Sequence, residues 1–248
     1  MATNAEGAIA DAARNNAAWC DAVARSHDAA GMFSDDLWYS ERKLPPFYPN
    51  LITLRAGGEA AQRNRAAALI ERGLPLPWAV KDSFAWLDLT ALGFECLFEA
   101  RWIASPPDES PPATEGSSIR WHRVATPAAL AAWEAAWRRD LPAGTSAIFR
   151  PVLLRDPAIS FLAGIEADRI VAGCVLNLAA GAIGLSNLFG SDALTSAVWA
   201  GCREQARRLA PDLPIVGYEQ AEALADAQAA GFRVLGPLRV WLKAEVGG

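Results

Sequence analysis

The chain has 248 residues, of which 52% are hydrophobic and 21% are charged, and its formal net charge is −5. This apolar fraction excludes a disordered chain, and the length suits one large domain or two small ones. A mildly acidic chain lacks the basic face of a general nucleic-acid binder and the polybasic segment of a membrane-surface protein. Residues 1–18 have no basic start typical of a signal peptide, and no run of about 18 apolar residues follows, so we expect a cytoplasmic protein with no membrane span.

The first part of the chain predicts a short strand at 51–54 and a helix at 59–72. A strand near 77–81 follows, and a short helix at 83–92 is predicted to end at Gly93. The next apolar run predicts a strand at 94–103.

A segment with four prolines, residues 105–118, is typical of an extended linker. It divides the chain into predicted domains at 1–104 and 119–248. The four cysteines and two histidines lie far apart, so no metal site and no redox motif is expected, and the thiols are expected to be reduced.

The second part alternates strands and helices. We predict a strand at 119–124, then a helix with Thr126 as its N-cap and Pro127 at its first position. Apolar runs at 159–166 and 170–177 form a hairpin, and a third strand covers 182–189. The remaining segments predict a helix at 193–209, a strand at 214–219, a helix at 221–230 that ends at Gly231, and a strand at 232–243 that is interrupted near Gly236. Together these elements predict a mixed α/β sheet.

The ends of the two parts share a weak repeat. A shift of 138 positions places Gly93-Phe94 on Gly231-Phe232 and Asp82 on Gln220. This ordered match predicts an internal duplication.

Residues 216–232, together with the order of elements, resemble the GNAT superfamily of acyl-CoA-dependent N-acetyltransferases. In that family a strand is followed by an Asn-x-x-Ala helix that ends in Gly-Phe; here Gln220 and Ala223 precede Gly231-Phe232. The resemblance covers about 125 residues, since it begins near residue 119, and it implies a tandem GNAT-like fold of two lobes with a truncated first copy.

The resemblance implies that acetyl-CoA lies between the strands at 182–189 and 214–219. The pantetheine would pair with the first of these strands, and the pyrophosphate would rest on the N-terminus of the next helix. The residues expected to bind the cosubstrate are Asn187, Leu188, Phe189, Gly190, Ser191, Asp192, Ala193 and Gln220.

Tyr218 and Glu219 would then close the second strand at the mouth of the site. Glu219 is the candidate general base for an amine, and Tyr218 is the candidate donor to the leaving thiolate. Because side chains alternate along a strand, we expect the two to face opposite sides of the sheet. The implied activity is transfer of an acetyl group to an amine by direct attack.

Two departures from the family pattern keep a second function open. The family's glycine-rich pyrophosphate loop is absent before Asp192, and the carboxylate of Asp192 would repel a diphosphate. In addition, Ala227 stands where the family often has a tyrosine that acts as a general acid. The alternative is a degenerate GNAT-fold module that binds a ligand or partner without catalysis. A second candidate loop, residues 55–59, carries Arg55 and two glycines before the helix of the first part. The sequence is compatible with a monomer or a homodimer and with any small-molecule or other amine acceptor.

Overall fold

The structure is a computed structural model that describes residues 2–73, 76–107, 118–139, 146–190 and 196–244. The chain divides into two compact units, one of Met1–Trp102 and Leu235–Gly248 and one of Ile103–Val234. This division differs from the predicted one at 119–248, because residues 235–248 belong to the first unit. Most of the predicted linker, residues 108–117, lies outside the described residues.

The first unit contains a sheet with strand order β1-β2-β3-β4-β11-β5. β3 and β4 are parallel, whereas β1–β2, β2–β3 and β4–β11 are antiparallel. Its elements are α1 (Ala2–Ser26), β1 (Met32–Phe33), β2 (Leu37–Tyr39), β3 (Leu51–Thr53), α2 (Glu59–Glu71), β4 (Trp78–Asp82), the 3-10 helix η1 (Thr90–Leu92), and most of β5 (Glu95–Ser105) and β11 (Arg233–Lys243).

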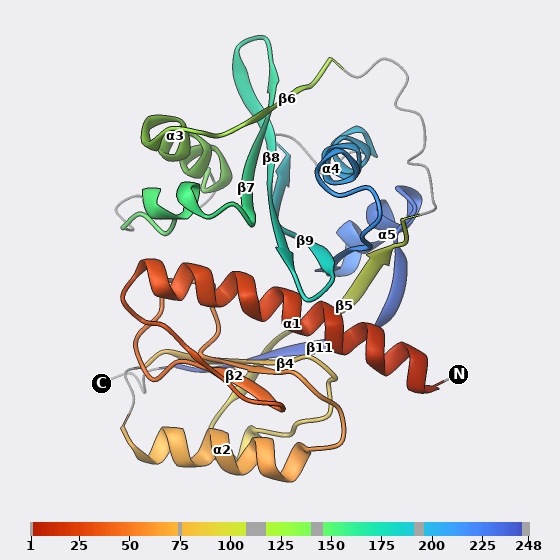
Figure 1. Ribbon diagram of the computed structural model, residues 1–248. Coiled ribbons are helices and arrows are strands. Elements are labelled where there is room, and N and C mark those ends of the chain that lie inside the picture. The colour runs from red at the N-terminus through yellow and green to blue at the C-terminus, as the bar shows by residue number, and fades with distance from the viewer. Residues whose placement is uncertain (1, 74–75, 108–117, 140–145, 191–195, 245–248) are drawn as a thin grey trace. The chain divides into compact units, whose positions relative to one another are not determined.

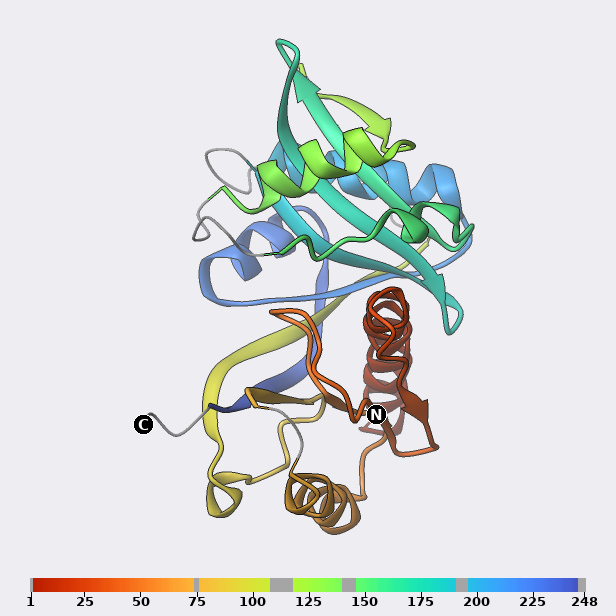
Figure 2. The same cartoon turned by 90° about the vertical axis from the view of Figure 1, so that its left-hand side faces the viewer.

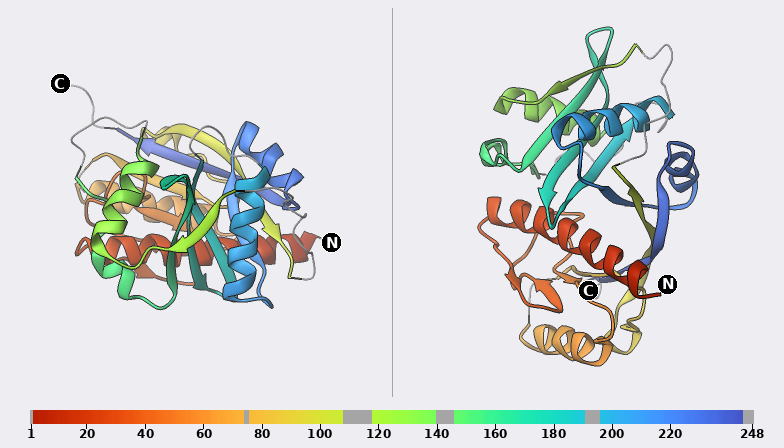
Figure 3. Two further views of the ribbon diagram at one scale, coloured as in Figure 1. Left: turned by 90° about the horizontal axis from the view of Figure 1, so that it is seen from above. Right: turned by 45° about the vertical axis from the view of Figure 1, so that its right-hand side comes forward.

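The helices α1 and α2 cover opposite faces of this sheet (Figures 1 and 3). On one face, Leu69 of α2 packs in a buried cluster with Leu51 and Val80. On the other face, Lys81 donates a hydrogen bond of 2.7 Å to Asn16 Oδ1 of α1. The alternation along β4 therefore separates an apolar face from a face that holds a buried lysine. The sequence analysis did not predict α1.

The helix predicted at 83–92 is wrong except for its last turn, which is η1. The Asp82 carboxylate accepts hydrogen bonds from the backbone N–H groups of Phe84 (3.4 Å) and Leu87 (2.8 Å). Ala85 has φ +55°, in the left-handed region. A side-chain acceptor thus competes with the helical backbone for these N–H groups and stabilises a loop instead.

The second unit contains a sheet with strand order β5-β10-β9-β8-β7-β6, to which β5 contributes its last residues, 103–105. The pairs from β6 to β9 are antiparallel, and β9 and β10 are parallel. The remaining elements are β6 (Arg120–Arg123), α3 (Pro127–Trp137), the 3-10 helix η2 (Pro151–Arg155), β7 (Ile159–Glu166), β8 (Arg169–Ala179), β9 (Ala182–Gly190), α4 (Ser196–Leu209), β10 (Ile215–Glu219) and α5 (Ala221–Ala229).

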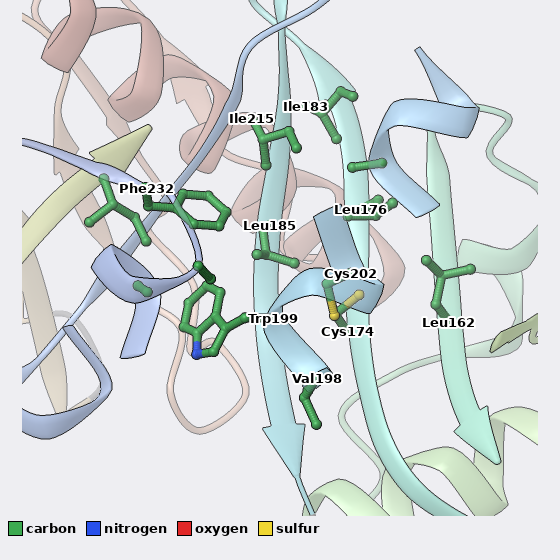
Figure 4. Close-up of a cluster of buried hydrophobic side chains, with 14 of the residues drawn as sticks. Leu162, Cys174, Leu176, Ile183, Leu185, Val198, Trp199, Cys202, Ile215 and Phe232 are labelled. Carbon is green, nitrogen blue, oxygen red and sulfur yellow. The ribbon is translucent and has the colours of Figure 1, made fainter. Parts of the chain in front are cut away.

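The helices α3 and α4 lie on opposite faces of the β7–β9 strands (Figures 1 and 2). On the α3 face, the Trp133 indole packs edge-on against Phe161 and Phe189. On the α4 face, Trp199 of α4 packs with Leu185 and Phe232 in a second buried cluster (Figure 4). This sheet with helices on both faces confirms the predicted mixed α/β architecture.

Two local predictions in this unit are also confirmed. Thr126 caps α3, because its Oγ1 accepts a hydrogen bond of 3.2 Å from the Ala129 N–H. Ala167 and Asp168 both have positive φ at the turn between β7 and β8, as a two-residue hairpin turn requires. Among the described residues, no helix has the length and apolar character needed to cross a bilayer.

The turn after α5 contains Gly231 at φ +88°. The N–H of Gly231 donates to the Gln228 carbonyl (2.9 Å), and the N–H of Phe232 donates to the Ala227 carbonyl (3.0 Å). These two bonds define a Schellman motif. Arg203 of α4 lies over the Phe232 ring, 5.7 Å from its centroid, and donates to the carbonyl just before the glycine.

The turn after η1 has the same backbone arrangement. Gly93 has φ +77°, its N–H donates to the Thr90 carbonyl (2.9 Å), and the Phe94 N–H donates to the Leu89 carbonyl (3.3 Å). Here Lys243 supplies the cation, with its Nζ 5.9 Å from the Phe94 centroid. The two Gly-Phe turns therefore have equivalent local structures, as expected from the sequence repeat.

A Gly231→Ala substitution is expected to destabilise the protein by roughly 2–4 kcal/mol. The new Cβ must adopt a positive φ and would lie 2.6 Å from Arg203 Nη1, so strain and overpacking add. Gly181→Ala is the control, because Gly181 also has a positive φ but has no atom within 4 Å of an added Cβ. It should cost about 1 kcal/mol. Urea unfolding measures both, and equal losses would contradict the role of Arg203.

The predicted interruption of the last strand near Gly236 is wrong, since β11 runs without a break from Arg233 to Lys243. The register of β11 with β4 begins at Arg239. Pro237 therefore precedes this ladder, and its missing N–H removes no hydrogen bond from it.

Candidate functional site

The parallel pair β9 and β10 positions the candidate site in the second unit. Its register pairs Ile183 with Ile215 and Gly184 with Val216. Gly217 then passes close to β9, since a Cβ added there would lie 3.0 Å from the Leu185 carbonyl oxygen. Among the described residues, the pairing of β9 with β10 ends at Gly184 and Val216, although β9 itself continues to Gly190. The edge of β9 beyond Leu185 can therefore pair with a ligand.

A β-bulge lies in β9 at the point where this pairing ends. Gly173 pairs with Phe189 and Val175 pairs with Ser186, so two residues of β9 lie opposite Cys174 alone. One of them, Asn187, has φ +52°. An extra residue of this kind changes the direction of the side chains that follow it.

The bulge sets the orientation of the predicted cosubstrate residues. Leu185 and Leu188 both pack in the cluster on the α4 face, although they are three positions apart. Phe189 points to the opposite face, where its ring lies 5.3 Å from Trp133. The side chains of Leu188 and Phe189 thus contribute to packing rather than to ligand binding.

Glu219 ends β10 on the face that α4 and α5 cover. Ile215 belongs to the cluster on that face, and the alternation of the strand places Gly217 and Glu219 on the same side. Tyr218 faces the other side. Burial raises the pKa of the Glu219 carboxyl from 4.5 to about 7, and a hydrogen bond from the Gln220 backbone N–H opposes this shift. A carboxyl with this pKa can exchange a proton at neutral pH.

The other predicted residues are placed only in part. Gln220 is the N-cap residue of α5, and its exposed side chain makes no capping hydrogen bond. Ser191, Asp192 and Ala193 lie outside the described residues. Within the described part of the chain, no cluster of His, Cys, Asp or Glu side chains could hold a metal ion.

In the first unit, hydrogen bonds join the ends of the corresponding parallel strands, β3 and β4. Thr53 Oγ1 accepts a bond of 2.7 Å from the Ser83 N–H, which joins the ends of the two strands. Asp82 has a raised pKa of about 6 because it is buried, yet its carboxylate accepts backbone N–H groups of the loop that follows. Lys81 is bonded to Asn16. These contacts occupy the polar groups that a ligand would need.

The alternative loop at residues 55–59 is also held by internal contacts. Arg55 Nε lies 2.9 Å from Asp36 Oδ1, and its carbonyl oxygen accepts a bond of 2.9 Å from Gln62 Nε2. Gly58 is the N-cap residue of α2, without a side-chain cap. The positive charge of this loop is therefore balanced within the first unit.

Sequence reasoning missed the polar face of α1, from which Asn16 contacts Lys81. The adjacent Asn15 and Asn16 in an alanine-rich segment were the available signal, because two asparagines in a helix interior disfavour the helix unless tertiary contacts compensate.

No protein-family model and no curated protein sequence matches the chain. Solved structures do match. A GCN5-related N-acetyltransferase from Kribbella flavida is similar with a TM-score of 0.67 at 13% identity, over 95% of this chain and 96% of that one. A GNAT-family acetyltransferase from Novosphingobium aromaticivorans has a TM-score of 0.57 at 12% identity, over 95% and 99%. A GCN5-related N-acetyltransferase from Sphaerobacter thermophilus has a TM-score of 0.53 at 17% identity, over 78% and 72%. The chain therefore has the fold of the GCN5-related N-acetyltransferases.

Proposed function

We propose that the chain is an N-acyltransferase that transfers an acetyl group from acetyl-CoA to an amine, with its site in the second unit. The observation that carries the proposal is the half-buried Glu219 carboxyl, whose pKa desolvation raises to about 7, at the end of β10 where the pairing with β9 has stopped. At the corresponding position of the first unit, the Asp82 carboxylate is hydrogen-bonded to its own loop.

Glu219 acts as the general base in this proposal. An amine acceptor is mostly protonated at neutral pH and must lose a proton before its nitrogen can attack the thioester carbonyl carbon. A carboxylate whose pKa lies near the working pH is suited to accept that proton. The new C–N bond then forms, the C–S bond breaks, and CoA leaves as a thiolate.

The backbone of β9 supplies the remaining groups. The edge of β9 that faces β10 can bind the pantetheine as an added strand. A backbone N–H of the same segment can donate to the thioester carbonyl as negative charge develops on its oxygen. Tyr218 faces the other side of β10, so it and Glu219 do not act on one reacting centre, and in this proposal the CoA thiolate takes up a proton from water.

Acetyl-CoA is expected to raise the melting temperature. At a concentration a hundredfold above Kd, ligand binding stabilises the folded state by about 2.7 kcal/mol, which corresponds to roughly 5–11 °C for a chain of this size. Differential scanning fluorimetry at increasing acetyl-CoA measures the shift. Desulfo-CoA and free adenosine test whether the whole cosubstrate is required.

The result also separates the two functions that the sequence leaves open. A shift without CoA release in the presence of amines would support a GNAT-fold module that binds its ligand but has lost catalysis. No shift with acetyl-CoA, longer acyl-CoAs or free CoA would overturn acyl-CoA binding altogether.

The first unit is, we infer, a truncated copy of the same fold. The equivalent Schellman turns at Gly93 and Gly231, each with a cation over the following phenylalanine, support this duplication. So does the parallel β3–β4 pair, which precedes the Gly93 turn as β9–β10 precedes the Gly231 turn.

A further inference from the structure

Two of the four cysteines face each other in the core of the second unit. Cys174 lies on β8 and Cys202 on α4, and their sulfur atoms meet between the strand and the helix (Figure 4). The two thiols are hydrogen-bonded, and neither residue has exposed surface (0% each). The side chains around them are apolar, and include Leu176 and Val198.

The other two cysteines have different surroundings. Cys20 belongs to α1 of the first unit, and its thiol is directed at Asn16 Oδ1, 3.8 Å away. Cys96 is exposed on β5. Of the four, only Cys174 and Cys202 therefore have a thiol as a neighbour, and they already occupy the two elements that a disulfide would join.

We propose that Cys174 and Cys202 are a redox pair that forms a disulfide when the protein meets a small two-electron oxidant such as hydrogen peroxide. Each thiol loses one hydrogen atom, and one S–S bond forms between the two sulfur atoms. The two hydrogen atoms, as two protons and two electrons, reduce one molecule of hydrogen peroxide to two water molecules. A small oxidant is chosen because both thiols are fully buried (0% exposed each) and become accessible only when the core opens.

The bond would enclose the segment to which the proposed function assigns acetyl-CoA. The chain between Cys174 and Cys202 contains β9 with its bulge at Asn187 and the start of α4. A cross-link between β8 and α4 would fix both ends of this segment. This consequence rests on the proposed function, whereas the disulfide itself does not.

The burial of the pair makes the reaction depend on local opening. Burial raises the pKa of the Cys202 thiol, so little of the reactive thiolate is present while α4 stays packed on β8. Oxidation must then proceed through states in which α4 separates from β8. A ligand that binds β9 and α4 together lowers the population of those states, so acetyl-CoA should slow the oxidation.

The test uses the full chain with Cys20→Ser and Cys96→Ser, which retains only the proposed pair. After peroxide treatment, we expect intact mass to fall by two hydrogen atoms, both thiols to become unreactive, and a digest to yield linked peptides. The melting temperature should rise by roughly 5–15 °C, since the cross-link restricts the unfolded chain. The wild-type chain and a Cys202→Ala variant of the test chain are controls, and the latter should show no gain.

Several results would overturn the proposal. One is that both thiols stay reduced at peroxide levels that fully oxidise Cys96 in the wild type. Another is a gain of oxygen on either cysteine without a linked peptide. If the disulfide forms at the same rate with and without saturating acetyl-CoA, the redox pair stands and its coupling to the proposed site is wrong.

Discussion

Glu219→Gln is expected to lower kcat/KM for the amine acceptor by a factor of about 10²–10⁴, which is the usual contribution of a general base. The glutamine has nearly the same shape as the glutamate but cannot accept the proton of the attacking amine. The measurement is the initial rate of CoA thiol release with the best acceptor found in a panel of amines. The affinity for acetyl-CoA, measured by the shift in melting temperature, should change little in this variant.

The pH dependence of the rate gives a second expectation for the same residue. Because Glu219 must be ionised to act as a base, kcat/KM should rise with pH and level off above its pKa of about 7. The residual rate of the Glu219→Gln variant should lack this inflection. An unchanged profile in the variant would assign the base to another group.

The same substitution should stabilise the protein at alkaline pH. The pKa of Glu219 is about 7 in the folded protein and near 4.5 in the unfolded chain, so the folded state retains its proton more tightly. The wild type therefore loses stability as pH rises from about 4.5 to 7, whereas the glutamine variant does not titrate. We expect the variant to be more stable by ~1–3 kcal/mol at pH 8 and the difference to vanish near pH 4.5. A loss of activity together with a gain of stability cannot be attributed to unfolding.

Asp82→Asn is the matched control. Asp82 is a buried carboxyl that, like Glu219, has a raised pKa, and it lies at the end of the corresponding strand of the first unit. Its carboxylate accepts backbone N–H groups, and an asparagine can replace only part of that role, which lowers stability. Because the pKa of Asp82 is raised to about 6, the asparagine also removes the cost of ionising this carboxyl at higher pH, so the two effects on stability oppose each other there. The activity per folded molecule should not change. A comparable loss of activity in both variants would contradict the placement of the base in the second unit.

Patterns within one element were the most predictable part of the fold. The apolar run at residues 159–166 predicts β7 with its observed bounds, Ile159–Glu166. The Gly231-Phe232 turn was predictable because only a glycine adopts a left-handed φ at little cost after a helix. Such signals depend on the backbone of a few neighbouring residues.

Features that depend on distant residues were not predictable in this way. The segment after Asp82 has helical composition, yet the Asp82 carboxylate, buried only after the sheet forms, holds it as a loop. Likewise, the sequence suggests Glu219 as a base by position alone. Its raised pKa follows from burial against α4 and α5, which no local pattern encodes.

Trp133→Ala is expected to destabilise the protein by about 3–5 kcal/mol, the usual cost of deleting a buried tryptophan. Trp133 has no exposed surface (0%), and its indole N–H donates a hydrogen bond of 2.8 Å to the Leu162 carbonyl of β7. Its ring lies 5.1 Å from Phe161 and 5.3 Å from Phe189, so it joins α3 to both β7 and β9. The change would leave a cavity on this face of the sheet, and the loss should appear as a lower urea midpoint by circular dichroism.

Two matched variants separate the contributions of packing and hydrogen bonding. Trp133→Phe keeps an aromatic ring but removes the indole N–H, so it should cost less than the alanine variant. Its own cost should include about 1 kcal/mol for the lost hydrogen bond to the Leu162 carbonyl. Trp137→Ala removes a half-buried ring that stacks on Trp133 at 6.5 Å, and should cost about 1–2 kcal/mol. Because Phe189 belongs to the segment proposed to bind acetyl-CoA, Trp133→Ala should also raise the Kd for acetyl-CoA more than Trp137→Ala does. A loss of stability below 1 kcal/mol for Trp133→Ala would show that this aromatic cluster does not hold β9 against α3.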